Sequence, residues 1–166
     1  MTSQATLSPR THRQVGLSPA ELAAYHAKGY HVARGLFSPQ HIARLSTEID
    51  GLHQRMADHA PDTVHVSWEE GLAEGRAKRI RQLMHSEAVS PIIDAMSRSP
   101  EILDILRQLI GPDLYLFHSK LMMKAAYDGT FTPWHQDWGY WQYSSLTPSQ
   151  VNCMLAVDAA DEANGA

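Results

Sequence analysis

The sequence predicts an α+β fold, with helices in the first two thirds of the chain and strands in the last third. Ser-Pro pairs that are typical of helix starts lie at 18–19, 38–39, 90–91 and 99–100. After residue 114, strand-forming residues and turn sequences take their place. The 166 residues, 43% of them hydrophobic, suffice for one domain with an apolar core. We therefore expect a single domain over residues 18–166, preceded by a flexible tail over residues 1–17.

Two helices are predicted near the N-terminus. The first begins after Ser18, a typical N-cap, has Glu21 at the capping-box position and ends at Gly29, since glycine is common just after the last turn. The second begins after Ser38. Its apolar side chains recur every three or four residues, which predicts one buried face made of Ile42, Leu45, Ile49, Leu52 and Met56.

The middle of the chain is predicted to hold two more helices and their connections. The helices begin at Pro91 and Pro100, and the second one ends at Gly111. Before them, we predict a short strand over residues 30–36 and a loop over residues 58–75.

The last third of the chain has the pattern of a sheet. Strands are predicted over residues 114–124 and 151–159, and Asp128-Gly129 marks a turn between them. Asn164-Gly165 is typical of a hairpin turn, and no strand follows it in the sequence. We therefore expect the sheet to be incomplete in this chain.

Composition and charge exclude several classes of function. With 14 basic and 18 acidic residues, the net charge is −4, which argues against a nucleic-acid partner. A basic cluster at 76–81 is typical of a solvated face or a helix start, and it also permits contact with an anionic ligand. The single cysteine, Cys153, excludes an intrachain disulfide and a cysteine-built zinc site. The apolar runs are far shorter than the roughly 20 residues of a membrane span. No segment resembles a signal peptide, so we expect a soluble, cytoplasmic protein.

The sharpest candidate site is the pair His135 and Asp137. On an extended segment, residues two apart point to the same face, with Cα atoms roughly 6.5–7 Å apart. An imidazole nitrogen and a carboxylate oxygen placed in this way suit Fe(II) and related divalent metals. The same pattern also occurs as an ordinary surface histidine beside an aspartate, so the spacing alone leaves both interpretations open.

Aromatic residues crowd around this pair, at Trp134, Trp138, Tyr140, Trp141 and Tyr143. Such a density of rings on a surface loop is costly unless the rings line a cavity or pack on a core. The rings are therefore predicted either to cap the sheet core or to form the wall of a substrate pocket.

Three stretches of the chain resemble the phytanoyl-CoA dioxygenase family of Fe(II)- and 2-oxoglutarate-dependent oxygenases. The first is GYHVARGLFSPQHIARL, and the second is LFHSKLMMKAAYDGTFTPWHQDWGYW, which contains the His-x-Asp pair. The third is LAVDAADEANGA, which is similar to the family's stretch before a glycine-containing hairpin. Together they extend the resemblance over most of residues 18–166.

The resemblance implies a double-stranded β-helix, that is, a cupin-like jelly roll, with the N-terminal helices packed on it. It also implies iron held by two histidines and one carboxylate, with positions left open for 2-oxoglutarate and O2. His135 and Asp137 match the first histidine and the carboxylate. The family's distal histidine, and the arginine that pairs with 2-oxoglutarate, come later than the last residue of this sequence. We therefore expect two of the three metal ligands here.

The resemblance assigns further roles. Lys120, Arg79 and Met154 match positions that contact 2-oxoglutarate, although they also fit a surface lysine, a helix-face charge and a core methionine. Trp138, Tyr140 and Trp141 are the candidates for shielding and contacting a small-molecule substrate. An aspartate at position 137 implies hydroxylation, because related halogenases carry a small residue there.

An alternative function keeps the same fold but not the chemistry. A truncated, catalytically inactive relative would act as a binding module and would recruit a partner through the open edge of its sheet. No motif in the sequence selects a substrate.

Overall fold

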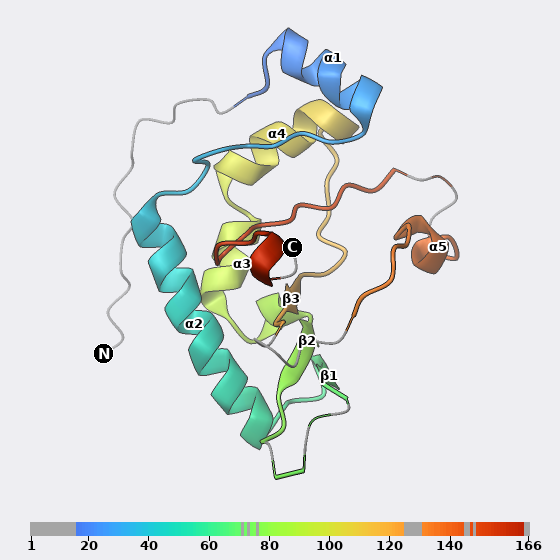
Figure 1. The fold of residues 1–166 in the computed structure, drawn as a ribbon. Coiled ribbons are helices and arrows are strands. Elements are labelled where there is room, and N and C mark those ends of the chain that lie inside the picture. The colour runs from blue at the N-terminus through green and yellow to red at the C-terminus, as the bar shows by residue number, and fades with distance from the viewer. Residues whose placement is uncertain are drawn as a thin grey trace.

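The structure is a computed structural model that describes residues 16–70, 72, 74–75, 77–124, 131–144, 147 and 149–164. Most of the predicted tail at residues 1–17, the Asp128-Gly129 turn and the glycine of the Asn164-Gly165 turn lie outside these residues. Within them, the chain combines helices with a small antiparallel sheet (Figure 1), which confirms the α+β prediction.

The elements follow one another in the order helix, strand, helix, strand, helix. They are α1 (Pro19–Lys28), α2 (Pro39–Asp58), β1 (His65–Trp68), β2 (Ile80–Met84), the 3-10 turn η1 (Ser86–Ala88), α3 (Pro91–Ser97), α4 (Pro100–Ile110), β3 (Lys120–Met122), α5 (Trp138–Trp141) and the 3-10 turn η2 (Glu162–Asn164).

The four helices α1 to α4 begin where the sequence predicts, and α1 and α4 also end at their predicted glycines. Ser18 and Glu21 form a capping box, in which the Ser18 hydroxyl accepts from the Glu21 amide and the Glu21 carboxylate accepts from the Ser18 amide. Gly29 ends α1 with φ of 82°, a left-handed conformation that glycine adopts without steric cost. Gly111 likewise follows α4. These boundaries were predictable because each depends on a few neighbouring residues.

The sheet has the strand order β1-β2-β3, with both pairs antiparallel. Val66 pairs with Leu83, and Leu83 pairs with Leu121, so one row of apolar side chains crosses all three strands. The register between β1 and β2 shifts after Ser67, which leaves Arg81 as an extra residue in a β-bulge.

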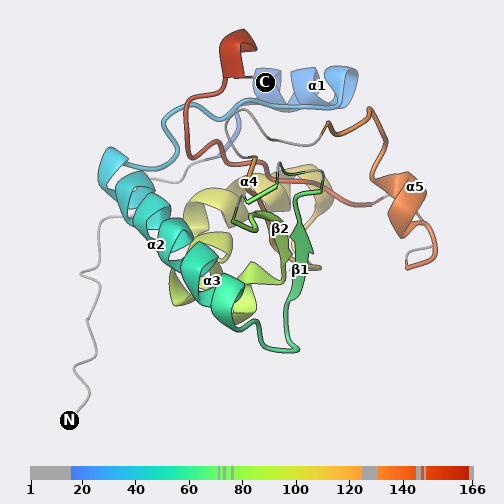
Figure 2. The ribbon, with the colours of Figure 1, turned by 60° about the horizontal axis from the view of Figure 1, so that its bottom comes forward.

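The core lies between this apolar row and the helices α2 and α3. Figure 2 shows α2 running along α3 on one side of the strands. A fully buried aliphatic side chain contributes about 1.5–3 kcal/mol to stability, so this cluster supplies the main packing energy of the fold. The buried members are Leu45, Leu52, Met56, Ile80, Leu83 and Ile93.

Three strand and loop predictions are wrong in detail. Residues 30–36 form no strand, because Tyr30 and Val32 are 62% and 59% exposed and no neighbouring strand pairs with them. β1 lies inside the predicted loop at 58–75. Of the two alternatives for the basic cluster at 76–81, the helix start is wrong, because the cluster leads into the strand β2, whereas Lys78 is exposed as on a solvated face.

Of the two predicted C-terminal strands, one is shorter than expected and the other does not form. Of residues 114–124, only Lys120–Met122 are in a strand, β3. Residues 151–159 are irregular and mostly exposed, although Val157 packs against the core. A strand needs a partner with free backbone groups, and among the described residues none lies beside this segment.

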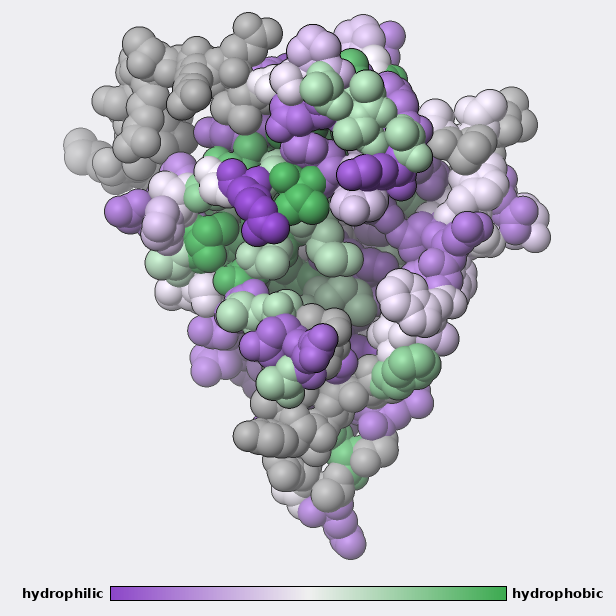
Figure 3. Space-filling model, turned by 45° about the horizontal axis from the view of Figure 1, so that its top comes forward, coloured by the Kyte–Doolittle hydropathy of each residue, from purple (hydrophilic) through white to green (hydrophobic). Residues whose placement is uncertain are grey.

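The exterior remains partly apolar. Figure 3 shows hydrophobic side chains gathered in the middle of one face, with hydrophilic side chains around them. No helix in the described part of the chain is long and apolar enough to cross a membrane.

Candidate metal centre

His135 and Asp137 lie on the segment that leads into α5. Asp137 is the N-cap residue of α5 and has helical backbone angles (φ −59°, ψ −34°), so the predicted extended conformation ends before it. The two side chains nevertheless converge, with His135 Nε2 at 3.2 Å from Asp137 Oδ1. Each side chain is 36% exposed, so the pair is open to a ligand. The structure thus brings together the two residues with the sharpest sequence pattern.

The other ring nitrogen of His135 fixes its tautomer. His135 Nδ1 lies 2.8 Å from the carbonyl oxygen of Pro133, and a carbonyl can only accept, so Nδ1 carries a hydrogen. In the neutral ring, Nε2 then presents a lone pair to a carboxylate oxygen. Two acceptors at this distance are stable only with a proton or a cation between them. Metal-binding histidines commonly donate their other N–H to a backbone carbonyl in this way.

The second carboxylate oxygen of Asp137 also has a hydrogen-bond partner. Asp137 Oδ2 accepts a hydrogen bond from the Asn152 side-chain amide, fifteen residues later in the chain. This contact ties the C-terminal segment to the candidate site and orients the carboxylate, a role that often supports metal ligands. Sequence reasoning missed Asn152. The available signal was a single polar amide inside the apolar run VNCMLAV.

These donors fit part of an iron site. One nitrogen and one oxygen, each with its own hydrogen-bond partner, match two positions of a facial triad. Among the described residues, no group of three His, Cys, Asp or Glu side chains is placed to hold a metal ion. The described residues therefore contain two side chains of the kind expected for metal ligands.

Two of the predicted substrate-contacting rings lie at the site. The Tyr140 ring meets the His135 ring edge to face, with centroids 5.6 Å apart. Trp141 packs on Phe117 and His118 at 5.2 and 5.1 Å. The third predicted ring, that of Trp138, is half-buried at the start of α5.

Two other rings near the pair are exposed and do not pack on the core. Trp134 is fully exposed and Tyr143 is 93% exposed, so neither caps the sheet core.

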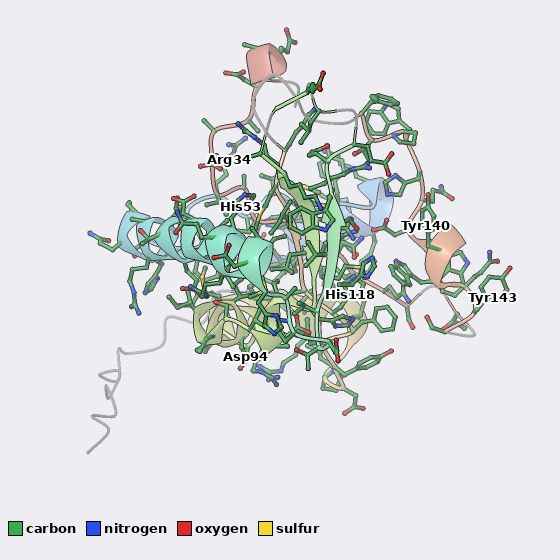
Figure 4. All side chains as sticks on the ribbon, turned by 90° about the horizontal axis from the view of Figure 1, so that it is seen from below. Arg34, His53, Asp94, His118, Tyr140 and Tyr143 are labelled. Carbon is green, nitrogen blue, oxygen red and sulfur yellow. The ribbon has the colours of Figure 1, made fainter. Side chains whose placement is uncertain are left out.

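His118 is a candidate site residue that sequence reasoning missed. Figure 4 shows it on the side of the sheet that faces α5, where Tyr140 lies. Burial lowers the pKa of His118, and the charges of Lys120 and His85 lower it further, while Glu87 and Asp137 act in the opposite direction. The ring is therefore held neutral beside the candidate centre. Its position two residues before Lys120, on the same face of an extended segment, was the signal available in the sequence.

The predicted 2-oxoglutarate contacts are not gathered in one place. Lys120 lies opposite Met84, at the end of the sheet near His118. Arg79 precedes β2, where its carbonyl accepts from the Glu69 amide, and it therefore lies at the other end of the strand from Met84. Met154 is 96% exposed. The roles of these three residues remain predictions.

A small cavity lies at the bulge side of the sheet. It has a volume of about 130 Å³ and includes Arg81, Lys124 and Thr132 in its wall, together with Glu69 and Met122. Arg81 belongs to the basic cluster at 76–81, and Thr132 begins the segment that carries His135. Two cationic side chains therefore line this cavity, and a third residue of its wall, Thr132, is three positions before His135 in the chain.

Comparisons with known proteins agree with this chemistry. The chain is 26% identical over 151 residues to an ectoine dioxygenase of Bordetella parapertussis, covering 90% of this chain and 47% of that protein. It is 26% identical over 126 residues to an L-proline trans-4-hydroxylase of Streptomyces griseoviridis, covering 75% and 43%. A protein of Stutzerimonas stutzeri named as a probable alpha-ketoglutarate-dependent hypophosphite dioxygenase is 27% identical over 142 residues, covering 86% of this chain and 48% of that protein. The chain thus spans about half the length of these relatives.

The family relationship covers nearly all of the described chain. Residues 25–166 match the family described as phytanoyl-CoA dioxygenase. This range contains the His135–Asp137 pair, its supporting amide Asn152 and the aromatic residues of α5. On these grounds, the chain belongs to the phytanoyl-CoA dioxygenase family.

Proposed function

We propose that this chain carries part of the active site of an Fe(II)- and 2-oxoglutarate-dependent dioxygenase that hydroxylates a small molecule. The observation that carries the proposal is the His135–Asp137 pair, in which an imidazole nitrogen and a carboxylate oxygen lie 3.2 Å apart. Membership of a family with named dioxygenases and hydroxylases supports the same reaction class.

The side chains have distinct roles in this proposal. His135 Nε2 and Asp137 Oδ1 bind Fe(II), and the metal, when bound, supplies the redox chemistry that couples O2 and 2-oxoglutarate to oxidation of the substrate. Pro133 keeps the imidazole in the correct tautomer through its carbonyl. Asn152 holds the carboxylate toward the metal. Because Asp137 provides a carboxylate ligand, the proposed outcome is hydroxylation and not halogenation.

The remaining residues bind and shield. Tyr140 and Trp141, together with Trp138 at the start of α5, form the proposed wall of the substrate site. Lys120 attracts the 2-oxoglutarate dianion at the His118 end of the sheet. For Arg79 and Met154, the proposed contact with 2-oxoglutarate rests on the family resemblance alone.

The fold proposed for the complete enzyme is a double-stranded β-helix, and the three-stranded antiparallel sheet is compatible with it. The relatives named after ectoine and L-proline point to small polar substrates.

The deciding experiment measures substrate-dependent succinate release by the protein that contains this chain, with Fe(II), ascorbate, 2-oxoglutarate and a panel of small polar metabolites. His135→Ala and Asp137→Ala are expected to abolish release, whereas the control His41→Ala, on the exposed side of α2, retains it. Full turnover in either site variant would remove the metal assignment. Binding of a partner without any turnover would favour the alternative of a non-catalytic module.

A further inference from the structure

A hydrogen-bonded junction joins the end of β2 to the start of β3, next to the candidate centre. The Ser119 hydroxyl donates to Glu87 Oε2 at 2.6 Å and accepts from the Glu87 amide at 3.1 Å. Its oxygen lies 2.5 Å from the Ser86 hydroxyl, which is fully buried. Since Ser119 has one hydroxyl hydrogen and gives it to Glu87, Ser86 must be the donor of this last bond. The result is a chain of hydrogen bonds, called the relay below, in which Ser86 donates to Ser119 and Ser119 donates to the Glu87 carboxylate.

Two backbone amides also bond within the junction. The Ser119 amide donates to Glu87 Oε2 at 3.1 Å, and the His85 amide donates to the Ser119 carbonyl at 2.9 Å. Burial acts to raise the pKa of Glu87, but hydrogen bonds from Ser119, the Glu87 backbone and His85 outweigh it and lower that pKa. Glu87 is therefore ionised, and charge-assisted hydrogen bonds of this kind are stronger than neutral ones.

His85 adopts a left-handed conformation to complete the junction. Its φ is 59°, and it is the one non-glycine residue with positive φ in the described chain. Such a conformation is strained for a non-glycine residue and is found preferentially at functional sites. It places Nδ1 3.5 Å from Glu87 Oε1 and sets the ring 5.8 Å from that of His118. The ring of His85 therefore packs edge to face against the ring of His118 and helps to hold it in place.

His118 connects this junction to the candidate centre through Trp141. It immediately precedes Ser119, and its ring lies 5.1 Å from that of Trp141. Trp141 belongs to the single helical turn whose N-cap residue is Asp137, and its amide bonds the Asp137 carbonyl at 3.2 Å. A continuous path of bonds and contacts therefore runs from Glu87 through Ser119, His118 and Trp141 to Asp137.

We propose that Glu87 is a positioning residue: through Ser119 it fixes His118 against Trp141 and so holds α5, and the Asp137 carboxylate, in the orientation that the candidate centre requires. The part of this inference that concerns metal binding rests on the proposed function. The part that concerns the orientation of α5 does not.

The test compares Glu87→Gln with Glu48→Gln in this chain. Glu48 is a matched control, because its side chain is 18% exposed, like that of Glu87, and pairs with Arg55 on α2. The sequence holds four tryptophans, so four indole N–H resonances can be followed by NMR, with the fully exposed Trp134 as an internal reference.

Positioning predicts two changes in Glu87→Gln. The Trp141 indole resonance shifts while that of Trp134 does not, and the Mn²⁺ concentration that half-broadens the Asp137 amide rises roughly threefold to tenfold. Glu48→Gln shows neither change.

A Glu87→Gln protein with an unaltered Trp141 resonance and Mn²⁺ response would overturn the proposal, even if it melts earlier. If Mn²⁺ fails to broaden the Asp137 amide resonance of the unaltered chain, the proposed metal centre is wrong. The Trp141 resonance alone then decides whether Glu87 positions α5. Ser119→Ala removes the middle hydroxyl of the relay and replaces Glu87→Gln if that variant does not fold.

Discussion

Among the ten histidines of the chain, His135 stands out through both of its ring nitrogens. Nδ1 gives its hydrogen to Pro133, and Nε2 faces Asp137 at 3.2 Å. The sequence predicted that the side chains of His135 and Asp137 would lie close together. Only the local backbone conformation decides this contact, because the two residues are two positions apart in the chain. The sequence did not predict Asn152 or His118, because their distance from the pair depends on how separate segments fold together.

The amide of Asn152 provides a residue-scale prediction. Asn152→Ala removes the hydrogen bond to Asp137 Oδ2 and leaves the carboxylate free to rotate, so Mn²⁺ affinity is expected to fall about 10- to 100-fold. Gln150→Ala, on the same irregular segment, serves as the control. Isothermal titration of both variants with Mn²⁺ measures the difference, and equal affinities would show that Asn152 does not orient the carboxylate.

Glu87 provides a second prediction at this scale, in the pH dependence of stability. Its pKa in the folded chain is lowered from the ordinary value of 4.5, so the unfolded chain binds the proton first as the pH falls. The stabilisation is present above about pH 4.5 and is lost as the pH drops through 4.5 toward the folded pKa. Urea unfolding at several pH values should show the gap between the unaltered chain and Glu87→Gln shrinking below pH 4.5. A gap that stays constant would contradict the assignment.

At the scale of elements, helices and strands differ in how far sequence specifies them. The start of α2 follows from Ser38 and Pro39, and its buried face follows from apolar spacing, so both are local properties. β1 is four residues long and lies inside a predicted loop, since its identity as a strand comes from pairing with β2. The irregular segment 151–157 shows the converse, because apolar residues alone do not make a strand without a partner.

Leu52 tests the assignment of the buried face of α2. It is fully buried between α2 and the sheet, so Leu52→Ala is expected to reduce the free energy of unfolding by about 2–5 kcal/mol. Gln54→Ala, on the exposed side of the same helix, is expected to change it by less than about 0.5 kcal/mol. Chemical denaturation of the two variants gives both values. A loss below about 1 kcal/mol for Leu52→Ala would place the core elsewhere.

At the scale of the whole molecule, the structure has a packed half and an open half. The helices α2 and α3 cover one face of the sheet, whereas residues 131–144 loop out to α5 and residues 149–164 run back from it past α3 (Figure 1), and these two segments make few backbone bonds. The packed half was predictable in outline because caps and apolar periodicity encode it. The placement of the open half depends on contacts such as Asp137–Asn152 and Trp141–His118, which join segments distant in sequence.

This division predicts a pattern of amide hydrogen exchange. The amides of β2, which pairs on both sides, should exchange slowest, and those of residues 150–157, none of which bonds a described backbone carbonyl, should exchange fastest. Adding Mn²⁺ with 2-oxoglutarate should slow exchange in residues 133–142 and 150–153, because a ligand held by His135 and Asp137 stabilises the segments that position them. α4, which contributes no ligand, should be unaffected and serves as the control. Uniform slowing across the chain would indicate general stabilisation, and slowing confined to β2 and α2 would place the ligand away from α5.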